Sequence, residues 1–434
     1  MLRSIPTLLV ITLCAFVCVS PAAAQIVWHV DDDAPNDPGP GNPSISDPLE
    51  NGTSEHPFDT IQEAIAAAFS GHIVRVEAGT YNERIDLLGK AITVESTGGP
   101  TSTTIDAQGT GSVVSCTHNE GPLTVIDGFR VRGGSATNLA GYPIPNGGKA
   151  GGGMFNWSAS PTVRNCRFVD NTANASSSGA GYGGGMANFQ NSNPSVTNCE
   201  FVNNFASGAI NGYGAGMVCS DGSSPTIVGC RFEGNTVSGH FNGFGGGLCI
   251  GGSSSPQVTD CTFRINAASG NTLYGYGAGA FVGNGGTNDP HFDGCRFIHN
   301  SSEEWGGGLY INSITPSTVV HACVFDSNSA ILSGGGIHAD RTSLPSISNT
   351  RFCASTPEHI VGSWHDSGGN SFSALKCCPA DVDDSGVVNV TDLLVVITFW
   401  GNPSGLGGIA DINHDGFVNV NDLLAVITGW GPCP

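Results

Sequence analysis

Oxygen-bearing side chains recur at the same positions in two twelve-residue segments near the C-terminal end, which begin at Asp381 and Asp411. In each segment, positions 1, 3, 5, 9 and 12 carry such a side chain and position 6 is glycine. Calcium takes six to eight oxygen ligands, and a loop around it uses one backbone carbonyl and a glycine at its sharp turn. The spacing therefore predicts two calcium ions, with the position-7 residues contributing carbonyls. The predicted ligands are Asp381, Asp383, Ser385, Val387, Asn389 and Asp392, and then Asp411, Asn413, Asp415, Phe417, Asn419 and Asp422.

Each predicted loop runs into a segment with apolar residues at helical spacing, 393–400 and 423–430. No comparable pattern precedes either loop, and position 12 is Asp instead of the Glu of an EF-hand. In these respects the pair resembles a type I dockerin domain. The resemblance implies a small α-helical, calcium-binding module that docks onto a cohesin-like scaffold protein. The alternative is a degenerate pair of loops that binds no metal.

Cysteines flank this module. Cys377 and Cys378 precede it and Cys433 follows it, so a bridge from either of the first two to Cys433 would tie its ends together. Cys353 could pair with the remaining one. The connectivity stays open here, because spacing alone does not select a pairing.

The middle of the chain is a repeat. Glycine clusters begin 28 to 32 residues apart, and behind each stands a phrase of the kind Cys166, Phe168, Asn171, whose cysteine becomes threonine in the last copy. The clusters begin at Gly151, Gly183, Gly214, Gly245, Gly277, Gly306 and Gly334. A period of this length, repeated this often, indicates stacked coils.

The phase of the apolar residues decides the kind of coil. Cys166 and Phe168 share one face of a strand, but Val163 lies out of phase with them, so the chain must turn a corner before Cys166. The residue before this position is Asn, Asp or Gly in six of seven repeats, and these residues tolerate left-handed backbone. The pattern predicts an all-β fold, a parallel β-helix. Its Cys and Phe columns would face the axis, and its Asn side chains would hydrogen-bond from coil to coil.

The N-terminal part predicts a cap and the first coils. Asp59 could cap a helix whose apolar face is Ile61, Ile65 and Phe69, and this helix would cover the open end of the core. Strands are predicted for the segments 73–76, 91–94, 103–105 and 123–126.

Two stretches resemble known β-helices. Residues 56–65, with Gly79, Tyr81 and Glu83, resemble the opening of pectin-lyase-like proteins. Residues 150–355 resemble the repeats of polymorphic outer-membrane proteins. The resemblance implies a right-handed parallel β-helix, a solenoid with an N-terminal capping helix.

An aromatic column precedes successive glycine clusters, at Tyr182, Tyr213, Phe244, Tyr276 and Trp305. If the column projects outward, it forms a strip with the spacing of the coils and suits the binding of a sugar chain. If it points inward, it is one more stack of the core, which is the preferred arrangement.

Catalytic residues are not evident in the sequence. A lyase would need a base beside carboxylates, and an inverting glycosidase a carboxylate pair. Asp106, Asp127 and the polar groups at 303–305 and 338–341 are the candidates, and each also fits a turn or a solvated rim.

Residues 1–24 predict a signal peptide, because Arg3 precedes an apolar run and Ala22–Ala24 offer small residues for cleavage. No later stretch is apolar for long enough to span a membrane. A formal charge of −21 argues against nucleic acid as a partner.

These patterns predict a β-helix domain over residues 25–375 and the dockerin-like module over 376–434. We expect a secreted or cell-surface protein that binds extracellular polysaccharide or another surface ligand. The module would attach it to a scaffold or envelope. The alternatives are a carbohydrate-active enzyme, either a polysaccharide lyase or a glycoside hydrolase, and a purely structural surface protein.

Overall fold

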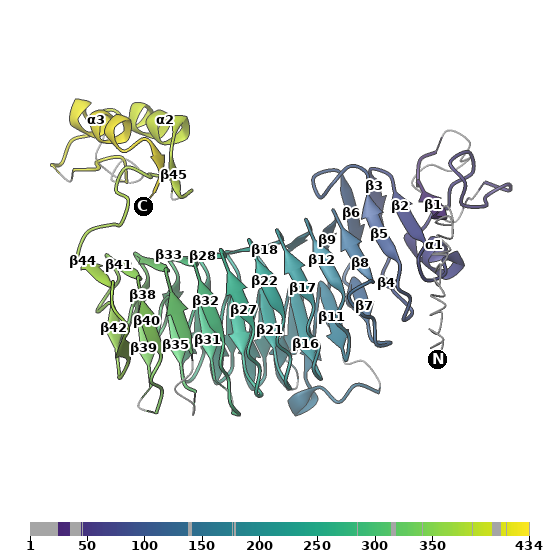
Figure 1. Cartoon of the computed structure of the whole chain (residues 1–434), viewed down its shortest axis with the longest axis horizontal. Helices are drawn as coiled ribbons and strands as arrows, with labels where there is room; N and C mark the ends of the chain where they lie inside the picture. Colours follow the sequence, from purple (N-terminus) through teal and green to yellow (C-terminus); the bar gives the residue numbers. More distant parts are fainter. Residues whose placement is uncertain are drawn as a thin grey trace, which may run out of the picture.

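The computed structural model describes residues 25–34, 45, 47–137, 141–175, 177, 179–283, 285–313, 318–340, 342–383, 385–401, 409–413 and 415–433. The predicted signal peptide, residues 1–24, lies outside the described residues. The strands of successive coils lie side by side along the long axis of the molecule, in chain order (Figure 1). They pair in parallel, so the predicted all-β parallel β-helix is confirmed.

Three sheets, named A, B and C, form the walls of the coils. Sheet A consists of β1 Val27–Val30, β2 Ile73–Val76, β5 Thr93–Ser96, β8 Val125–Asp127, β12 Thr162–Arg164, β17 Ser195–Thr197, β22 Thr226–Val228, β27 Gln257–Thr259, β32 His291–Asp293, β36 Val319–His321, β40 Ser346–Ser348 and β43 His365–Asp366. Sheet B consists of β3 Gly79–Tyr81, β6 Thr103–Asp106, β9 Arg130–Arg132, β13 Arg167–Val169, β18 Glu200–Val202, β23 Arg231–Glu233, β28 Thr262–Arg264, β33 Arg296–Ile298, β37 Val324–Asp326, β41 Arg351–Cys353 and β44 Ser371–Ser373. Sheet C consists of β4 Ile85–Asp86, β7 Val114–Cys116, β11 Met154–Trp157, β16 Met186–Phe189, β21 Met217–Cys219, β26 Leu248–Ile250, β31 Ala280–Val282, β35 Leu309–Ile311, β39 Ile337–Ala339 and β42 Ile360–Val361.

Two smaller sheets, D and E, follow sheet B in the middle coils and form a thin two-layered arm before the chain enters sheet C. Sheet D consists of β14 Thr172–Ala175, β19 Phe205–Gly208, β24 Thr236–Gly239, β29 Ala267–Gly270, β34 Ser301–Ser302 and β38 Ser329–Ala330. Sheet E consists of β10 Lys149–Ala150, β15 Gly181–Tyr182, β20 Asn211–Tyr213, β25 Asn242–Phe244 and β30 Gly275–Tyr276. The two layers pack closely because sheet E turns a glycine toward sheet D. A Cβ on Gly212 would lie 2.1 Å from the carbonyl oxygen of Ser238, so no larger residue fits there.

One-residue corners join sheet A to sheet B. The residues before the cysteine position all have φ between 49° and 63°, as predicted, and even Ala322 adopts this conformation. The turn brings the Cys and Phe columns to the axis, where the side chains of Cys230 and Phe232, for example, are buried. Neighbouring Phe rings of the column stack with centroids 4.5 to 5.1 Å apart.

Helix α1, Ile61–Ala67, packs on β1, β2 and β4 at the N-terminal end of the coils (Figure 1). It buries Ile61 and Ile65, as predicted, but two details of the prediction are wrong. The N-cap is Thr60, whose side chain accepts a hydrogen bond from the Glu63 amide, so Asp59 stands one position too early. Phe69 follows the end of the helix and is 72% exposed, because the helix is too short to carry it to the core.

The C-terminal module contains helices α2 Val390–Thr398 and α3 Val420–Thr428, which pack on each other, and the short strands β45 Val387–Val388 and β46 Gly431–Pro432. Its apolar cluster, which includes Val388, Val396 and Val426, is separate from the core of the coils. A short 3₁₀ turn, Pro145–Gly147, precedes sheet E. No helix in the described part of the chain is long and apolar enough to cross a membrane.

Two disulfides fix the module. Cys353 pairs with Cys377 and ties it to the last coils, and Cys378 pairs with Cys433 and joins its two ends. The alternatives left open by the sequence are thereby resolved. The nine other described cysteines are buried and form no disulfide.

Candidate functional site

A groove runs along the outer face of sheet C, in the angle between that sheet and the arm. The outward side chains of sheet C and those of sheet E form one apolar cluster, separate from the core of the coils. The floor of the groove is formed by Phe155, Ala187, Val218, Cys249, Phe281 and Tyr310. Its arm-side wall is formed by the aromatic column that the sequence singled out, Tyr182, Tyr213, Phe244, Tyr276 and Trp305.

The aromatic column is a stack, but it lies outside the core of the coils. The rings of Tyr182 and Tyr213 are 4.8 Å apart and 7° from parallel, and the next two steps are 5.1 Å each. The preferred inward arrangement is therefore wrong, because sheet E belongs to the arm. Since each ring covers the face of the next, the groove is lined by ring edges. The Tyr213 hydroxyl accepts a hydrogen bond of 2.8 Å from the Asn211 amide group.

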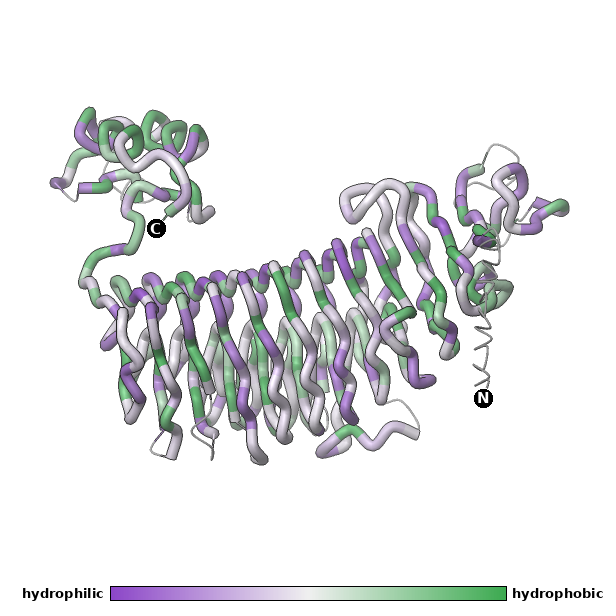
Figure 2. Tube along the Cα trace, viewed as in Figure 1, coloured by the Kyte–Doolittle hydropathy of each residue, from purple (hydrophilic) through white to green (hydrophobic). Residues whose placement is uncertain are grey.

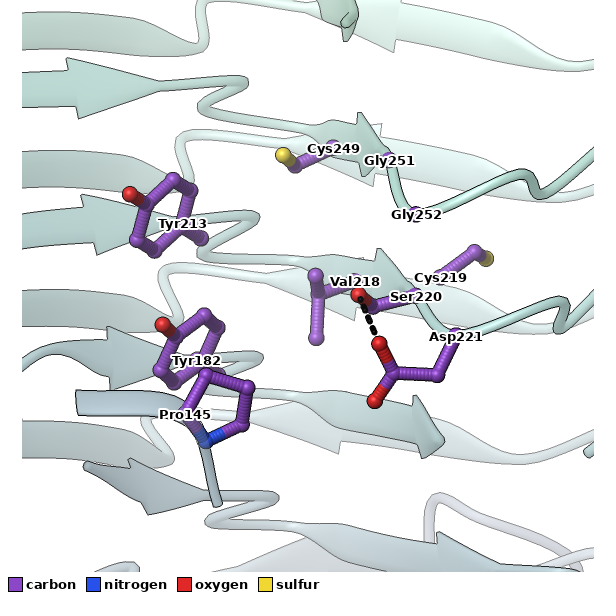
Figure 3. Close-up of a pocket in the computed structure, with 10 residues that line it drawn as sticks. All are labelled: Pro145, Tyr182, Tyr213, Val218, Cys219, Ser220, Asp221, Cys249, Gly251 and Gly252. Atoms are coloured by element: carbon purple, nitrogen blue, oxygen red, sulfur yellow. Dashed lines mark hydrogen bonds between the residues drawn. The ribbon is translucent and has the colours of Figure 1, made fainter. Parts of the chain in front are cut away.

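The largest hollow of the groove has a volume of about 420 Å³ and lies beside β21 and β26 (Figure 3). Tyr182 and Tyr213 stand on one side of it, and Asp221 stands on the other with its carboxylate turned inward. The Ser220 hydroxyl lies 3.3 Å from Asp221 Oδ1, at hydrogen-bond distance. Burial raises the pKa of both tyrosines, so their phenols stay neutral at physiological pH.

The hollow exists because the floor residues are small at this point. Ala187, Val218 and Cys249 follow one another along the floor, whereas Phe155 and Phe281 occupy the positions on either side. A second hollow of about 340 Å³ lies farther along the groove. It is lined by Phe244, Tyr276, Phe281, Gly285, Gly286, Tyr310 and Asn312.

Sequence reasoning missed the floor and Asp221. A signal for the floor was present, because the strand after each glycine cluster is apolar at consecutive positions, as in Met217, Val218 and Cys219. Such a strand is buried on both faces. The position of Asp221 depends on the loop after β21, and no spacing in the sequence indicates it.

The two polar segments that the sequence offers as catalytic candidates, 303–305 and 338–341, come together near the C-terminal end of the stack, where Trp305 contacts His338. His338 stacks on Tyr310 with ring centroids 5.2 Å apart, and the Tyr310 hydroxyl lies 3.5 Å from Asp340 Oδ2. Burial lowers the pKa of His338, which favours the neutral imidazole, and it raises the pKa of Glu304. Burial, with Tyr274, Glu304 and Asp340 nearby, raises the pKa of Tyr276 to about 12. The group thus combines a neutral imidazole with the carboxylates of Glu304 and Asp340.

The other two catalytic candidates lie in ion pairs on sheets A and B. Asp106 accepts a hydrogen bond of 2.8 Å from Arg132 Nε, and Asp127 accepts one of 2.7 Å from Arg164 Nε. Both carboxylates hold neighbouring coils together. They lie on sheets other than those that form the groove.

Three of the predicted calcium ligands lie close together in the first loop. Carboxylate oxygens of Asp381, Asp383 and Asp392 lie within 4.8 Å of one another. The Val387 carbonyl accepts hydrogen bonds of 3.1 Å from Ser385 Oγ and 3.0 Å from Asn389 Nδ2, so it faces two predicted ligands. Converging carboxylates of this kind, with a neutral carbonyl among them, fit a calcium ion.

The second loop has the same internal hydrogen bonds. Asp422 is buried and accepts from the amides of Ile412, Asn413 and Asn419, as Asp392 does in the first loop. The Phe417 carbonyl accepts from Asn419 Nδ2 at 3.1 Å. In both loops the position-6 glycine has φ near 90°, which the turn requires.

The first loop also touches the coils. Arg264 Nη2 donates a hydrogen bond of 3.0 Å to the Asp383 carbonyl oxygen, and Arg296 Nη2 lies 4.0 Å from Asp381 Oδ2. Both arginines belong to sheet B. This face of the coils therefore contacts the module through its positive charges.

The helices of the module are rich in apolar residues (Figure 2), and two matching sets of these residues are exposed to solvent. Their exposed apolar residues are each 50–57% exposed: Val390, Leu394, Ile397 and Trp400 in the first unit, and Val420, Leu424, Ile427 and Trp430 in the second. Apolar faces of this kind mark contact with another molecule.

Two family models match the chain. The model described as a right-handed β-helix region matches residues 115–284 and 210–352, which together span more than half of the chain. The protein therefore belongs to the right-handed β-helix family. The model described as a dockerin type I domain matches residues 379–428, so the C-terminal module is a type I dockerin. Dockerins of this type bind calcium and have cohesin-type partners, and proteins that carry them are typically extracellular or on the cell surface.

A comparison with solved structures finds several similar chains at low sequence identity. The pectate lyase Pel9A is 14% identical, with a TM-score of 0.42 over 80% of each chain. An alginate lyase from Paenibacillus sp. str. FPU-7 is 11% identical, with a TM-score of 0.39 over 72% of this chain and 94% of its own. A pectin methylesterase from carrot is 10% identical, with a TM-score of 0.33 over 82% and 89%. A search of curated proteins finds no match.

Proposed function

We propose that the protein holds an extracellular polysaccharide in the groove along sheet C and is attached to a scaffold through its dockerin. The observation that carries this proposal is the groove itself. Two hollows of about 420 and 340 Å³ lie on one line, each within the size range of sites for small organic molecules. Because floor and wall repeat with every coil, they suit a ligand that also repeats.

The groove combines the two kinds of surface that a sugar chain requires. Val218 and Cys249 offer an apolar floor for the C–H groups of a sugar ring, and Ser220 and Asp221 offer hydrogen-bond partners for its hydroxyl groups. This division between apolar and polar sides is typical of sites that orient an amphipathic ligand.

The dockerin would be loaded with two calcium ions, held by the twelve predicted ligands. Bound calcium would fix the loops that begin α2 and α3 and so orient the exposed apolar faces of the two helices. These faces are the proposed contact for a cohesin-like scaffold protein. Attachment outside the cell agrees with the predicted signal peptide.

A variant that fills the larger hollow tests the groove. Val218→Phe adds a ring to a column in which Phe155 and Phe281, two strands away on either side, already carry one, so the sheet should accept it. Thr226→Phe, on the exposed side of sheet A, is the matched control. We expect native gels containing soluble polysaccharides to retard the wild type and the T226F variant but not V218F. Equal retardation of all three proteins would contradict the proposal.

The group at the end of the groove favours a second candidate function, cleavage of the bound chain by a polysaccharide lyase or a glycoside hydrolase. His338 and Asp340 stand where a chain lying in the groove would pass. Incubation with a bound polysaccharide would then release unsaturated or reducing ends, and His338→Ala would abolish the release. Retention without any release would leave the protein as a binder.

A further inference from the structure

The charges around the groove indicate which class of polysaccharide binds there. Asp221 is the one charged side chain among the described residues that line the two hollows. Two further carboxylates, Glu304 and Asp340, lie near Tyr276, which lines the second hollow. The whole chain is also acidic, with a formal charge of −21. An anionic sugar chain would therefore meet repulsion along the described part of the groove.

The positive charges of the β-helix lie mainly on another face. The outer side of sheet B carries Arg130, Arg132, Arg167, Arg231, Arg264, Arg296 and Arg351. Several of them pair with Glu200 or Glu233 on neighbouring strands. Among the described residues, the positive charges that a polyuronate requires therefore lie on sheet B and not along the two hollows.

Asp221 is placed so that it can distinguish uncharged from anionic sugars. Its carboxylate points into the larger hollow, toward the side of Tyr182 and Val218 (Figure 3). In the described part of the chain it makes no ion pair, and Ser220 supplies its one side-chain hydrogen bond. An ionised carboxylate is an acceptor only, so it binds sugar hydroxyl groups and repels sugar carboxylates.

We propose that the groove selects an uncharged polysaccharide and that Asp221 sets this selectivity. The inference rests on the proposed function, because it assumes that a sugar chain lies in the groove. It assigns to Asp221 a specificity role that a purely structural loop residue would not have. Uronic-acid polymers are thereby excluded as the ligand of this groove.

The test compares uncharged polysaccharides, such as galactomannan, xylan and hydroxyethylcellulose, with polygalacturonate and alginate. The full-length, calcium-loaded protein is titrated with each, and the titrations are repeated at about 50 mM and 500 mM NaCl, which changes the screening length about threefold. We expect binding to at least one uncharged polymer with little dependence on salt. We expect no binding of the uronates at low salt.

Two variants, one at Asp221 and one control, test whether the Asp221 side chain contributes to binding. Asp221→Asn keeps the shape but removes the charge, and the loss of a charged hydrogen bond should weaken binding of the uncharged polymer about tenfold. Asp170→Asn is the matched control, because Asp170 has the same left-handed backbone, φ 55° against 54°, on an exposed corner away from the groove. It should bind as the wild type does.

Each outcome separates the inference from the proposed function. Tight uronate binding that V218F abolishes would overturn the selectivity but keep the groove as the site. Uncharged-polymer binding that D221N leaves unchanged would overturn the role of Asp221. Binding that V218F does not affect, or no binding to any polymer, would overturn the proposed function and the inference with it.

Discussion

Asn235 makes hydrogen bonds to two neighbouring coils at once. Its Oδ1 accepts hydrogen bonds from the backbone N–H and the side-chain Nδ2 of Asn204 in one neighbouring coil. Its Nδ2 donates hydrogen bonds to the Phe201 carbonyl oxygen and, in the coil on the other side, to Asn266 Oδ1. The same pattern recurs at the other asparagines of the column, all of them buried. Single residues therefore hold the coils in register, because a shift by one position would leave every one of these groups without its partner.

Removing one asparagine tests this at the scale of the residue. Asn235→Ala leaves the buried Asn204 amide and the Phe201 carbonyl without their partners, at about 1–3 kcal/mol each. We expect the free energy of unfolding to fall by about 2–5 kcal/mol, measured by denaturant titration. Asn82→Ala, at an exposed position, should change it by less than about 0.5 kcal/mol. Equal effects of the two substitutions would refute the ladder as a source of stability.

Helix α1 closes the N-terminal end of the coils, and its own first turn is held by a side chain from the bend between β3 and β4. Glu83 accepts hydrogen bonds from the amides of Ile61 and Gln62, at 2.8 and 2.9 Å. Burial raises the pKa of Glu83 to about 7, although these amides lower it. The resemblance of Gly79, Tyr81 and Glu83 to other β-helices thus has a structural meaning here, as the device that attaches the capping helix.

The pKa of Glu83 predicts how the cap responds to pH. Because the folded protein binds this proton more tightly than the unfolded chain, the stabilisation is complete below pH 4.5 and is lost as pH rises to about 7. We expect the melting temperature to fall over this range, and Glu83→Gln to flatten the decline. Asp31, whose burial raises its pKa to about 6, adds a decline of the same sign to both proteins. Parallel pH profiles for the two proteins would show that Glu83 does not cause the decline.

The whole molecule consists of two folding cores linked by a disulfide. The apolar cluster of the coils and that of the dockerin share no residue, and Cys353–Cys377 joins them. The groove and the apolar helix faces of the dockerin belong to different units. Ligand binding and attachment can therefore be tested separately on the intact chain.

Removal of calcium by a chelator should separate the melting transitions of the dockerin and the β-helix in a calorimetric scan. Under the proposed assignment, calcium binds the folded loops and not the unfolded chain, and an ion at about a hundred times its Kd would contribute about 2.7 kcal/mol. We expect EGTA to lower the melting temperature of the dockerin while that of the β-helix stays constant, with excess calcium reversing the effect. A dockerin transition that ignores EGTA would contradict the calcium assignment.

The repeat determined most of the fold by itself. Its period predicted the coils, its corner residues predicted the left-handed turns, and its Cys, Phe and Asn columns predicted the inner ladders, because each of these follows from the phase of short strands. The proposed calcium loops are equally local, since all six predicted ligands of an ion lie within twelve residues.

The groove was decided by the tertiary structure. Tyr213 follows a glycine in a two-layered arm, and the sequence does not reveal that this arm directs the aromatic column over sheet C and away from the core. Asp221 comes to face Tyr182 only because coils stack, which brings together residues about one repeat apart. Local patterns set which side chains lie inside a coil, but the outer surfaces face each other only once the arm has folded back against the stack.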